Sequence, residues 1–280
     1  EYAFSFTEIK EIYIPSKVSK ICEGAFRDCK NLTKVKIQSN SNLQTIGEYA
    51  FSDSNIRAIS IPSKVTKICK WAFYGCENLT KVEIPPNSNL QTIERFAFSE
   101  SKIKEIYIPS TIKIILSYSF TDCSNLIKVE IPPNSNLQTI ESSAFSFTGI
   151  KEIYIPSKVT KICEGAFFYC KNLTKVKIPP NSNLQTIKAD VFSDSNISEI
   201  FIPSNVTEIC KWVFYNCKNL TKVEIPPNSN LQTIESDAFS STRIKEIYFP
   251  TSLKQLKEGW CKNTSDLTKI TISPSNGQFK

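Results

Sequence analysis

The chain has 280 residues, 40% hydrophobic and 22% charged, which is the composition of an ordinary soluble protein with a sizeable core. Its net charge of +7 permits contact with an anionic surface without requiring it. Histidine and methionine are absent. The lack of histidine excludes the commonest general base, histidine-containing catalytic triads, and most zinc and haem sites. Because methionine is missing, we expect the chain to be a fragment of a longer protein.

An Ile-Pro step recurs through the whole chain at intervals that alternate between 23 residues, as from Ile14 to Ile37, and 24 residues, as from Ile37 to Ile61. The step begins at Ile14, Ile61, Ile84, Ile108, Ile131, Ile155, Ile178, Ile202 and Ile225, and variants begin at Ile37, Phe249 and Ile272. Repeats of this length form stacked coils. The sequence therefore predicts a solenoid in which two kinds of coil alternate.

Within each coil the apolar residues are spaced L-x-x-V-x-I, as in Leu32, Val35 and Ile37. The V-x-I part alternates as a half-buried strand does, and the proline and Ser/Asn-rich turn that follow end the strand. The return leg carries a phenylalanine in nearly every coil, which we expect to stack as a core spine. These residues are Phe4, Phe26, Phe51, Phe73, Phe98, Phe120, Phe145, Phe167, Phe192, Phe214 and Phe239.

The two ends of the chain differ in regularity. Residues 1–249 are expected to form regular coils that begin in the middle of a coil. Residues 250–280 are expected to form a divergent last repeat that is either a cap or the start of an insert, because Leu256 and Trp260-Cys261 replace the usual motifs. The longest aliphatic run is about Ile114 to Leu116, so we expect no transmembrane segment.

Three features together, Ile-Pro after the strand, Ala-Phe on the return leg, and Cys-x-x-Leu before the next strand (Cys76 to Leu79), resemble BspA-like leucine-rich repeats over the whole chain. The alternating S-N-L-Q-T-I coils, as at Ser88 to Ile93, look most like the expanded protist members of that family. The resemblance implies a curved right-handed leucine-rich-repeat solenoid with a parallel β-sheet on its concave face. It also implies a cell-surface or secreted, non-enzymatic role in adhesion to a protein or glycan of host cells, matrix or other microbes.

The outward residues of the strands should form two columns that run across the sheet. Within a column, residues on neighbouring strands should lie about 4.8 Å apart. The first alternates in charge from Glu11 and Lys34 to Glu246 and Lys269, except at Ala58, and is interpreted as a structural ladder of cross-strand pairs. The second places an aromatic residue on most alternate rungs. Its aromatic members are either a binding stripe or residues chosen for strand propensity. Its candidate ligand-binding residues are Tyr13, Lys36, Glu83, Tyr107, Glu130, Tyr154, Lys177, Phe201, Glu224 and Tyr248.

The ten cysteines form four C-x6-C pairs, beginning at Cys22, Cys69, Cys163 and Cys210, together with Cys123 and Cys261. In the coil of Cys123 the first cysteine is replaced by Leu116, which favours buried free thiols over within-coil disulfides. No C-x-x-C pair is present, so no metal site is expected.

Sequons for N-glycosylation in a secreted protein occur at Asn31, Asn78, Asn172, Asn196, Asn205, Asn219 and Asn263. The repeated turn motif also explains several of them.

Several functional classes are disfavoured. The seven glycines are too scattered for a phosphate-binding loop, so no nucleotide cofactor is expected. Basic residues are interleaved with acidic ones, which argues against nucleic-acid binding. The carboxylates repeat with the coil, so no unique acid-base pair marks an enzyme. Near-identity between coils leaves a second hypothesis open, that the array is a structural spacer, coat or self-associating matrix element.

Overall fold

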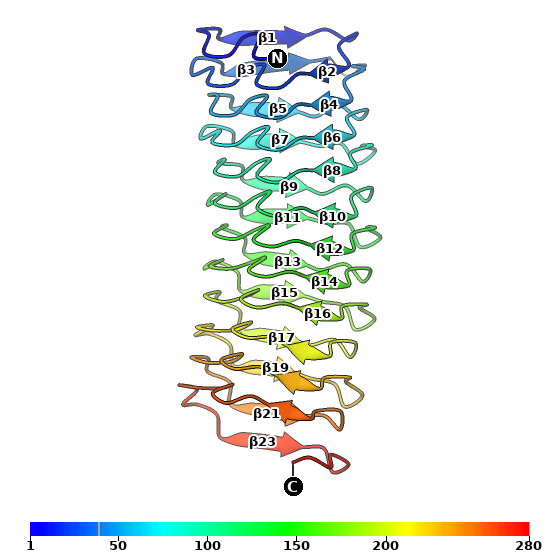
Figure 1. The fold of residues 1–280 in the computed structure, drawn as a ribbon, viewed down its shortest axis with the longest axis vertical. Helices are drawn as coiled ribbons and strands as arrows, with labels where there is room; N and C mark the ends of the chain where they lie inside the picture. The colour runs from blue at the N-terminus through cyan, green and yellow to red at the C-terminus, as the bar shows by residue number, and fades with distance from the viewer. Residues whose placement is uncertain (39, 280) are drawn as a thin grey trace. The chain divides into compact units, whose positions relative to one another are not determined.

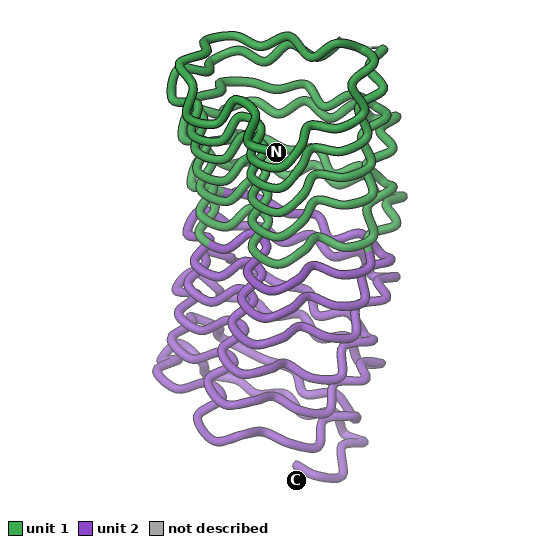
Figure 2. The backbone as a smooth tube through the Cα atoms, turned by 45° about the horizontal axis from the view of Figure 1, so that its top comes forward, with its two compact units in different colours: residues 1–137, 147–149 green, residues 138–146, 150–280 purple. Residues whose placement is uncertain are grey.

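The computed structural model describes residues 1–38 and 40–279. Parallel strands follow one another as a β-solenoid, with no helix among these residues, and this confirms the predicted leucine-rich-repeat solenoid (Figure 1). The chain divides into two compact units (Figure 2). The first comprises residues 1–137 and 147–149, and the second comprises residues 138–146 and 150–280.

Coils of the first unit contribute one long and one short strand each. The long strands are β1 (Glu11–Ile14), β3 (Lys34–Ile37), β5 (Ala58–Ser60), β7 (Lys81–Glu83), β9 (Glu105–Tyr107) and β11 (Lys128–Glu130). The short strands are β2 (Lys20–Ile21), β4 (Thr45–Ile46), β6 (Lys67–Ile68), β8 (Thr92–Ile93) and β10 (Ile114–Ile115). The long strands pair in parallel as β1–β3, β5–β7 and β9–β11, and the short strands pair from β2 to β8.

The second unit repeats this arrangement. Its long strands are β13 (Glu152–Tyr154), β15 (Lys175–Lys177), β17 (Glu199–Phe201), β19 (Lys222–Glu224), β21 (Glu246–Phe249) and β23 (Lys269–Ile272). Its short strands are β12 (Thr139–Ile140), β14 (Lys161–Ile162), β16 (Thr186–Ile187), β18 (Glu208–Ile209), β20 (Thr233–Ile234) and β22 (Gln255–Leu256). Each strand pairs in parallel with the next strand of its kind, so two sheets line opposite sides of the same core.

The part of each return leg that follows the short strand and carries the phenylalanine forms backbone hydrogen bonds to the neighbouring coils, although it is not a strand. Each contains two residues in the left-handed backbone region, such as Gly24 (φ 56°) and Asp28 (φ 54°), conformations that suit glycine and aspartate. Between them the Phe26 N–H donates to the carbonyl of Ala50 in the next coil at 2.8 Å, whereas the Ala25 N–H donates within its own turn at 3.3 Å. Alternate N–H groups therefore join coil to coil, as in a sheet.

The phenylalanine spine is confirmed. Phe51 through Phe239 of the expected series are fully buried, and neighbouring rings within a unit stack nearly parallel, as at Phe73 and Phe98 with centroids 5.0 Å apart and planes 5° apart. Phe4, in the first coil, is the exception, with 43% of its surface exposed. Offset stacking of this kind adds to the free energy gained by burying the rings.

A second buried column is polar. Cys76 is fully buried and its S–H donates to the carbonyl oxygen of Phe51 at 3.0 Å; Cys123 and Cys217 make the same bond in their coils. In the last coil Thr264 occupies this position, and its hydroxyl donates to the carbonyl of Phe239 at 2.9 Å. In the other kind of coil the equivalent residue is a serine or threonine, such as Ser54, whose oxygen lies 3.7 Å from the sulfur of Cys76. Thiols and hydroxyls therefore alternate along each unit.

The expectation of buried thiols is right for the second cysteine of each pair and wrong for the first in several coils. All ten cysteines are free thiols, but Cys22 is exposed, and Cys69 and Cys163 are only half-buried. The reason is strand alternation: Ile21, the residue before Cys22, points into the core, so Cys22 points away from it. The hydrogen bond of the second cysteine was not predicted from the sequence.

Replacing one ring of the spine should leave a cavity that the stacked neighbours cannot close. Phe192 lies between Phe167 and Phe214, with centroids 5.7 and 5.8 Å away. We expect Phe192→Ala to lower the free energy of unfolding by about 3 to 5 kcal/mol in urea titrations followed by circular dichroism. Tyr215→Ser is the control, because Tyr215 is 39% exposed and neighbouring coils carry Ser193 and Ser240 at this position. Equal losses in the two variants would contradict a ring-dependent core.

The cysteines should differ in reactivity according to burial. Burial raises the pKa of Cys76, Cys123 and Cys217 to about 12, so at pH 8 these side chains are thiols and lack the reactive thiolate. We expect Ellman's reagent at pH 8 to modify Cys22 first and these three only after unfolding in guanidinium chloride, with peptide mass mapping as the measurement. Modification of Cys76 in the folded protein as fast as that of Cys22 would show that the core column opens in solution.

Candidate functional site

The outward side chains of the long strands form one surface in each unit, which we call the long-strand face. In the first unit Tyr13 pairs in register with Lys36, Ser60 with Glu83, and Tyr107 with Glu130. The second unit pairs Tyr154 with Lys177, Phe201 with Glu224, and Tyr248 with Thr271 in the same way. Within each unit, the pairing therefore aligns the residues as the repeat predicts.

The candidate binding residues all reach this face, but to different extents. Lys36, Glu83, Glu130, Lys177 and Glu224 are exposed. Tyr13 is 50% exposed, whereas the other aromatic candidates, Tyr107, Tyr154, Phe201 and Tyr248, are half-buried. Half-buried tyrosine offers part of its ring and its hydroxyl to a partner while the remainder packs on the sheet. The structure brings Tyr107 together with Glu83 and Glu130 in the first unit, and it aligns the later candidates in the second.

The ion pairs of the face differ from the expected cross-strand ladder. Cross-strand pairs of the predicted kind occur at Lys34–Glu11 and Lys269–Glu246. In strands with the sequence Lys-Val-Glu the lysine instead pairs with the glutamate two residues ahead on the same strand, as in Lys81–Glu83 (2.5 Å) and Lys128–Glu130 (3.1 Å). The remaining pairs, Lys36–Glu11 and Lys177–Glu152, are diagonal. Because side chains two apart on one strand lie on the same face, they compete with the cross-strand neighbour.

These pairs hold the face in its charged form. Hydrogen bonds from Lys81 and then from Ser60 lower the pKa of the Glu83 carboxyl, and the bond from Lys36 lowers that of Glu11. The same contacts raise the pKa of Lys81 and Lys36. The paired carboxylates and ammonium groups thus stay ionised at neutral pH. All of them are well exposed, so each pair is worth little to stability and serves mainly to orient the side chains.

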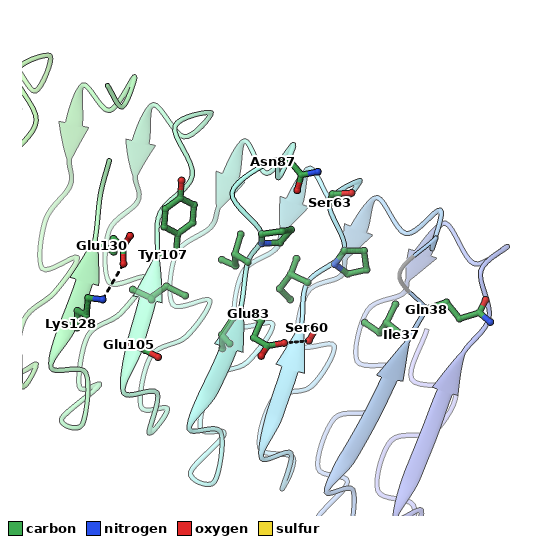
Figure 3. A pocket seen from close by; sticks show the side chains of 16 residues that line it. Ile37, Gln38, Ser60, Ser63, Glu83, Asn87, Glu105, Tyr107, Lys128 and Glu130 are labelled. Carbon is green, nitrogen blue, oxygen red and sulfur yellow. Dashed lines mark hydrogen bonds and ion pairs between the residues drawn. The ribbon is translucent and has the colours of Figure 1, made fainter. Parts of the chain in front are cut away.

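A groove of about 690 Å³ crosses the long-strand face of the first unit (Figure 3). Its lining combines outward residues of β5 to β11, among them Ser60, Glu83, Glu105 and Tyr107, with apolar residues where the strands end, including Pro85. A volume of this size suits a small ligand or a few side chains of a partner. The groove is therefore a concave feature that includes three of the candidate residues, Glu83, Tyr107 and Glu130, with Glu105 beside them.

The groove lies where the repeat is interrupted. Coils of this kind carry an aromatic residue in the second column, as at Tyr13 and Tyr107, but the coil of β5 carries Ser60 there and Ala58 in place of glutamate. Two large side chains are thereby replaced by small ones. The departure at Ala58 does not by itself predict a groove, because the size of a gap depends on how far the neighbouring side chains lean into it.

A stack of aromatic residues on the return legs was not singled out from the sequence. In the first unit Tyr49, Trp71, Phe96 and Tyr118 stack with centroid separations of 4.9, 5.7 and 4.8 Å. All four have left-handed backbone conformations, which bulky side chains rarely adopt. The signal that could have found them is the residue before Ala-Phe or Ser-Phe, which is aromatic in four successive coils. Cations cover part of the stack: Arg27 lies 5.0 Å from the Tyr49 ring centre, and Lys70 lies 4.7 Å from that of Trp71.

All seven sequon asparagines are exposed. Several already use their amide nitrogens: Asn31 donates to Glu8, Asn78 donates to Asn55, and Asn219 donates to Asn196 at 3.3 Å. The sequons of Asn196 and Asn219 thus lie side by side on successive coils.

In the part of the chain that the structure describes, no group of three or more histidine, cysteine, aspartate or glutamate residues is placed to hold a metal ion, and no helix could span a membrane.

Comparisons with solved structures agree with this fold. A leucine-rich repeat protein from Bacteroides ovatus is 26% identical, with a TM-score of 0.76 over 95% of this chain and 73% of that one. A leucine rich cell surface protein from Faecalibacterium prausnitzii is 22% identical (TM-score 0.51, 99% and 83% covered), and the pneumococcal vaccine antigen PcpA is 17% identical (TM-score 0.52, 95% and 72% covered). Neither of the last two shows more than a shared fold. No curated protein matches the chain.

The family model of the BspA type leucine rich repeat region matches residues 1–89, 44–174 and 160–280, in six copies. The matches overlap and together extend from the first residue to the last. Both kinds of coil, including the divergent last one, therefore fall within the model. The chain belongs to the family of BspA-type leucine-rich repeat proteins.

Proposed function

We propose that this chain is a non-enzymatic binding module, displayed at a cell surface or secreted, that adheres to a macromolecule through its long-strand face. The observation that carries the proposal is the alignment of aromatic and charged side chains on that face, with a groove of about 690 Å³ at the interruption of the repeat. Its family supports a protein-interaction role, and the partner is a protein or glycan of host cells, matrix or another microbe.

The chemistry of the face suits recognition better than catalysis. Tyrosine supplies a large contact area with little loss of side-chain entropy, and a hydroxyl that can donate or accept. The ion pairs around the tyrosines fix the directions of lysine and glutamate side chains, so a partner meets an ordered pattern of charge. Equivalent carboxylates recur from coil to coil, a pattern that favours repeated contacts over the single pair of differently tuned groups that general acid-base catalysis uses.

Removing tyrosines from the long-strand face should abolish adhesion without unfolding the protein. We expect Tyr107→Ser/Tyr154→Ser/Tyr248→Ser to weaken binding by at least about tenfold, since buried aromatic anchors dominate interfaces. The measurement is saturation binding of the labelled chain to epithelial cells, fibronectin, laminin and an array of purified glycans. Serine is tolerated at this position, because Ser60 occupies it in the first unit.

The matched control removes three tyrosines from the return legs, with the variant Tyr118→Ser/Tyr169→Ser/Tyr215→Ser. These tyrosines are 39%, 36% and 39% exposed, and other coils carry Ser143, Ser241 and Ser240 at their positions. The control should bind as the unmodified chain does. Loss of binding in the control alone would place the site on the return legs. Indifference of both variants, together with concentration-dependent growth in light scattering, would favour a self-associating structural element.

We also propose that the exposed sequons are used when the protein passes through a eukaryotic secretory pathway. The contact between Asn196 and Asn219 sets a limit, since a glycan on one side chain covers its neighbour. Expression in secreting mammalian cells should therefore yield fewer than seven glycans per chain by intact mass, with Asn196 and Asn219 modified in alternation by peptide mapping. A chain without glycans, or one fully modified at all seven sites, would contradict this proposal.

A further inference from the structure

The groove of the first unit owes its depth to a missing side chain at Ser60. Its coil lacks the aromatic ring that Tyr13 and Tyr107 provide at the equivalent position. Pro62, which follows the strand, is half-buried and lines the groove. Its equivalents Pro109, Pro156, Pro203 and Pro250 are buried, and Pro15 in the first coil is exposed. The recess at Ser60 therefore extends from the polar middle of the strands to an apolar rim of prolines.

One carboxylate in this groove makes no direct ion pair. Lys81 is paired with Glu83 and Lys128 with Glu130, each on its own strand. Ser60 donates a further hydrogen bond to Glu83, as the dashed lines in Figure 3 show. Glu105 is exposed, and among residues 1–38 and 40–279 no cation lies within ion-pair distance of it. Lys81 and Lys128 on the neighbouring strands attract Glu105 without a direct contact. Three glutamates nevertheless face two lysines at this groove, so it has one negative charge in excess.

The surroundings of Glu105 define which cation fits. Tyr107 and Glu105 both project from β9 into the groove (Figure 3). Pro62 and Pro85, which follow the ends of β5 and β7, also line it. An aliphatic stem can lie against the prolines while a planar cation stacks on the tyrosine ring and bonds the carboxylate. Arginine matches this combination better than lysine, because its guanidinium is planar, stacks on aromatic rings and binds a carboxylate through two N–H groups.

We propose that the recess at Ser60 is a subsite for an arginine side chain of a protein partner, with Glu105 as its ion-pair partner and Tyr107 as its stacking surface. This inference rests on the proposed adhesive function and names the partner as a protein with an exposed arginine. The preference is for a cation, because three glutamates line the groove and the two nearest lysines, Lys81 and Lys128, are each paired with one of them.

The direct test uses small probes in place of the unidentified partner. Acetyl-Gly-Arg-Gly-amide is titrated into the isotope-labelled 280-residue chain, and amide chemical shifts are followed by nuclear magnetic resonance. The citrulline peptide of the same shape, which is uncharged, is the control ligand. We expect saturable shifts at Ser60, Glu83, Glu105 and Tyr107 with the arginine peptide only. Equal shifts with both peptides, or no saturable shift, would overturn the inference.

Two variants locate the contact. Ser60→Tyr restores the residue that the repeat carries elsewhere, so it should fold normally, fill the recess and abolish the arginine-dependent shifts. Glu105→Gln should weaken binding about tenfold, as expected for loss of one charge-assisted contact. Glu199→Gln is the matched control, because Glu199 is the equivalent residue beside Phe201 in the second unit; it should change the affinity by less than about twofold. Equal effects of the two glutamate variants would overturn the assignment.

The same variants separate this inference from the proposed function. In the adhesion assay, Ser60→Tyr and Glu105→Gln should reduce binding to the protein ligands of the panel. Normal binding by both, with loss in the variant lacking Tyr107, Tyr154 and Tyr248, would overturn the arginine subsite and leave adhesion through the long-strand face intact. Normal binding by all three variants would overturn both.

Discussion

Each coil depends on the coils beside it to cover its phenylalanine and to pair its backbone. The rings within a unit stack with centroids 5.0 to 5.8 Å apart, and the N–H groups of strands and return legs donate to the next coil. A single coil has no other way to bury its apolar face, so stability accumulates from interfaces between neighbours. This dependence explains why the sequence keeps the Ala-Phe and L-x-x-V-x-I positions so uniform while the outward positions vary.

The fixed spacing of the core determines what the surface can be. Because the register is set by inward residues such as Ile12 and Val35, every outward residue joins a straight column within its unit. A groove cannot then arise from a long loop and must come from changes of side-chain size within a column. Ser60 and Ala58 provide that change in the first unit. In the second unit Phe201 keeps an aromatic side chain at the position equivalent to Ser60.

The repeat made the strands, their register and the phenylalanine spine predictable from the sequence, because each follows from a period and an alternation. The ion pairs of the long-strand face were less predictable, because each lysine has more than one glutamate within reach. Lys81 could reach a glutamate on its own strand or across the sheet, and only its side-chain torsions select Glu83. Burial of Cys22 was wrongly expected because a leucine stands at the equivalent position in another coil, although Leu116 itself is only half-buried. Because Lys81 and Lys128 pair along their own strands, Glu105 is left without a direct ion pair, which the sequence did not predict.

The alternating column of thiols and hydroxyls restricts how such an array can evolve. Cysteine coils are separated by a serine or threonine coil, which keeps equivalent sulfurs two rungs apart and beyond the reach of a disulfide. Deletion or duplication of one coil would place two cysteine coils on adjacent rungs, about 4.8 Å apart, where an oxidising environment could cross-link them inside the core. Gain or loss of coils in pairs, 47 residues at a time, keeps the thiols on alternate coils; 47 is the sum of the 23- and 24-residue intervals.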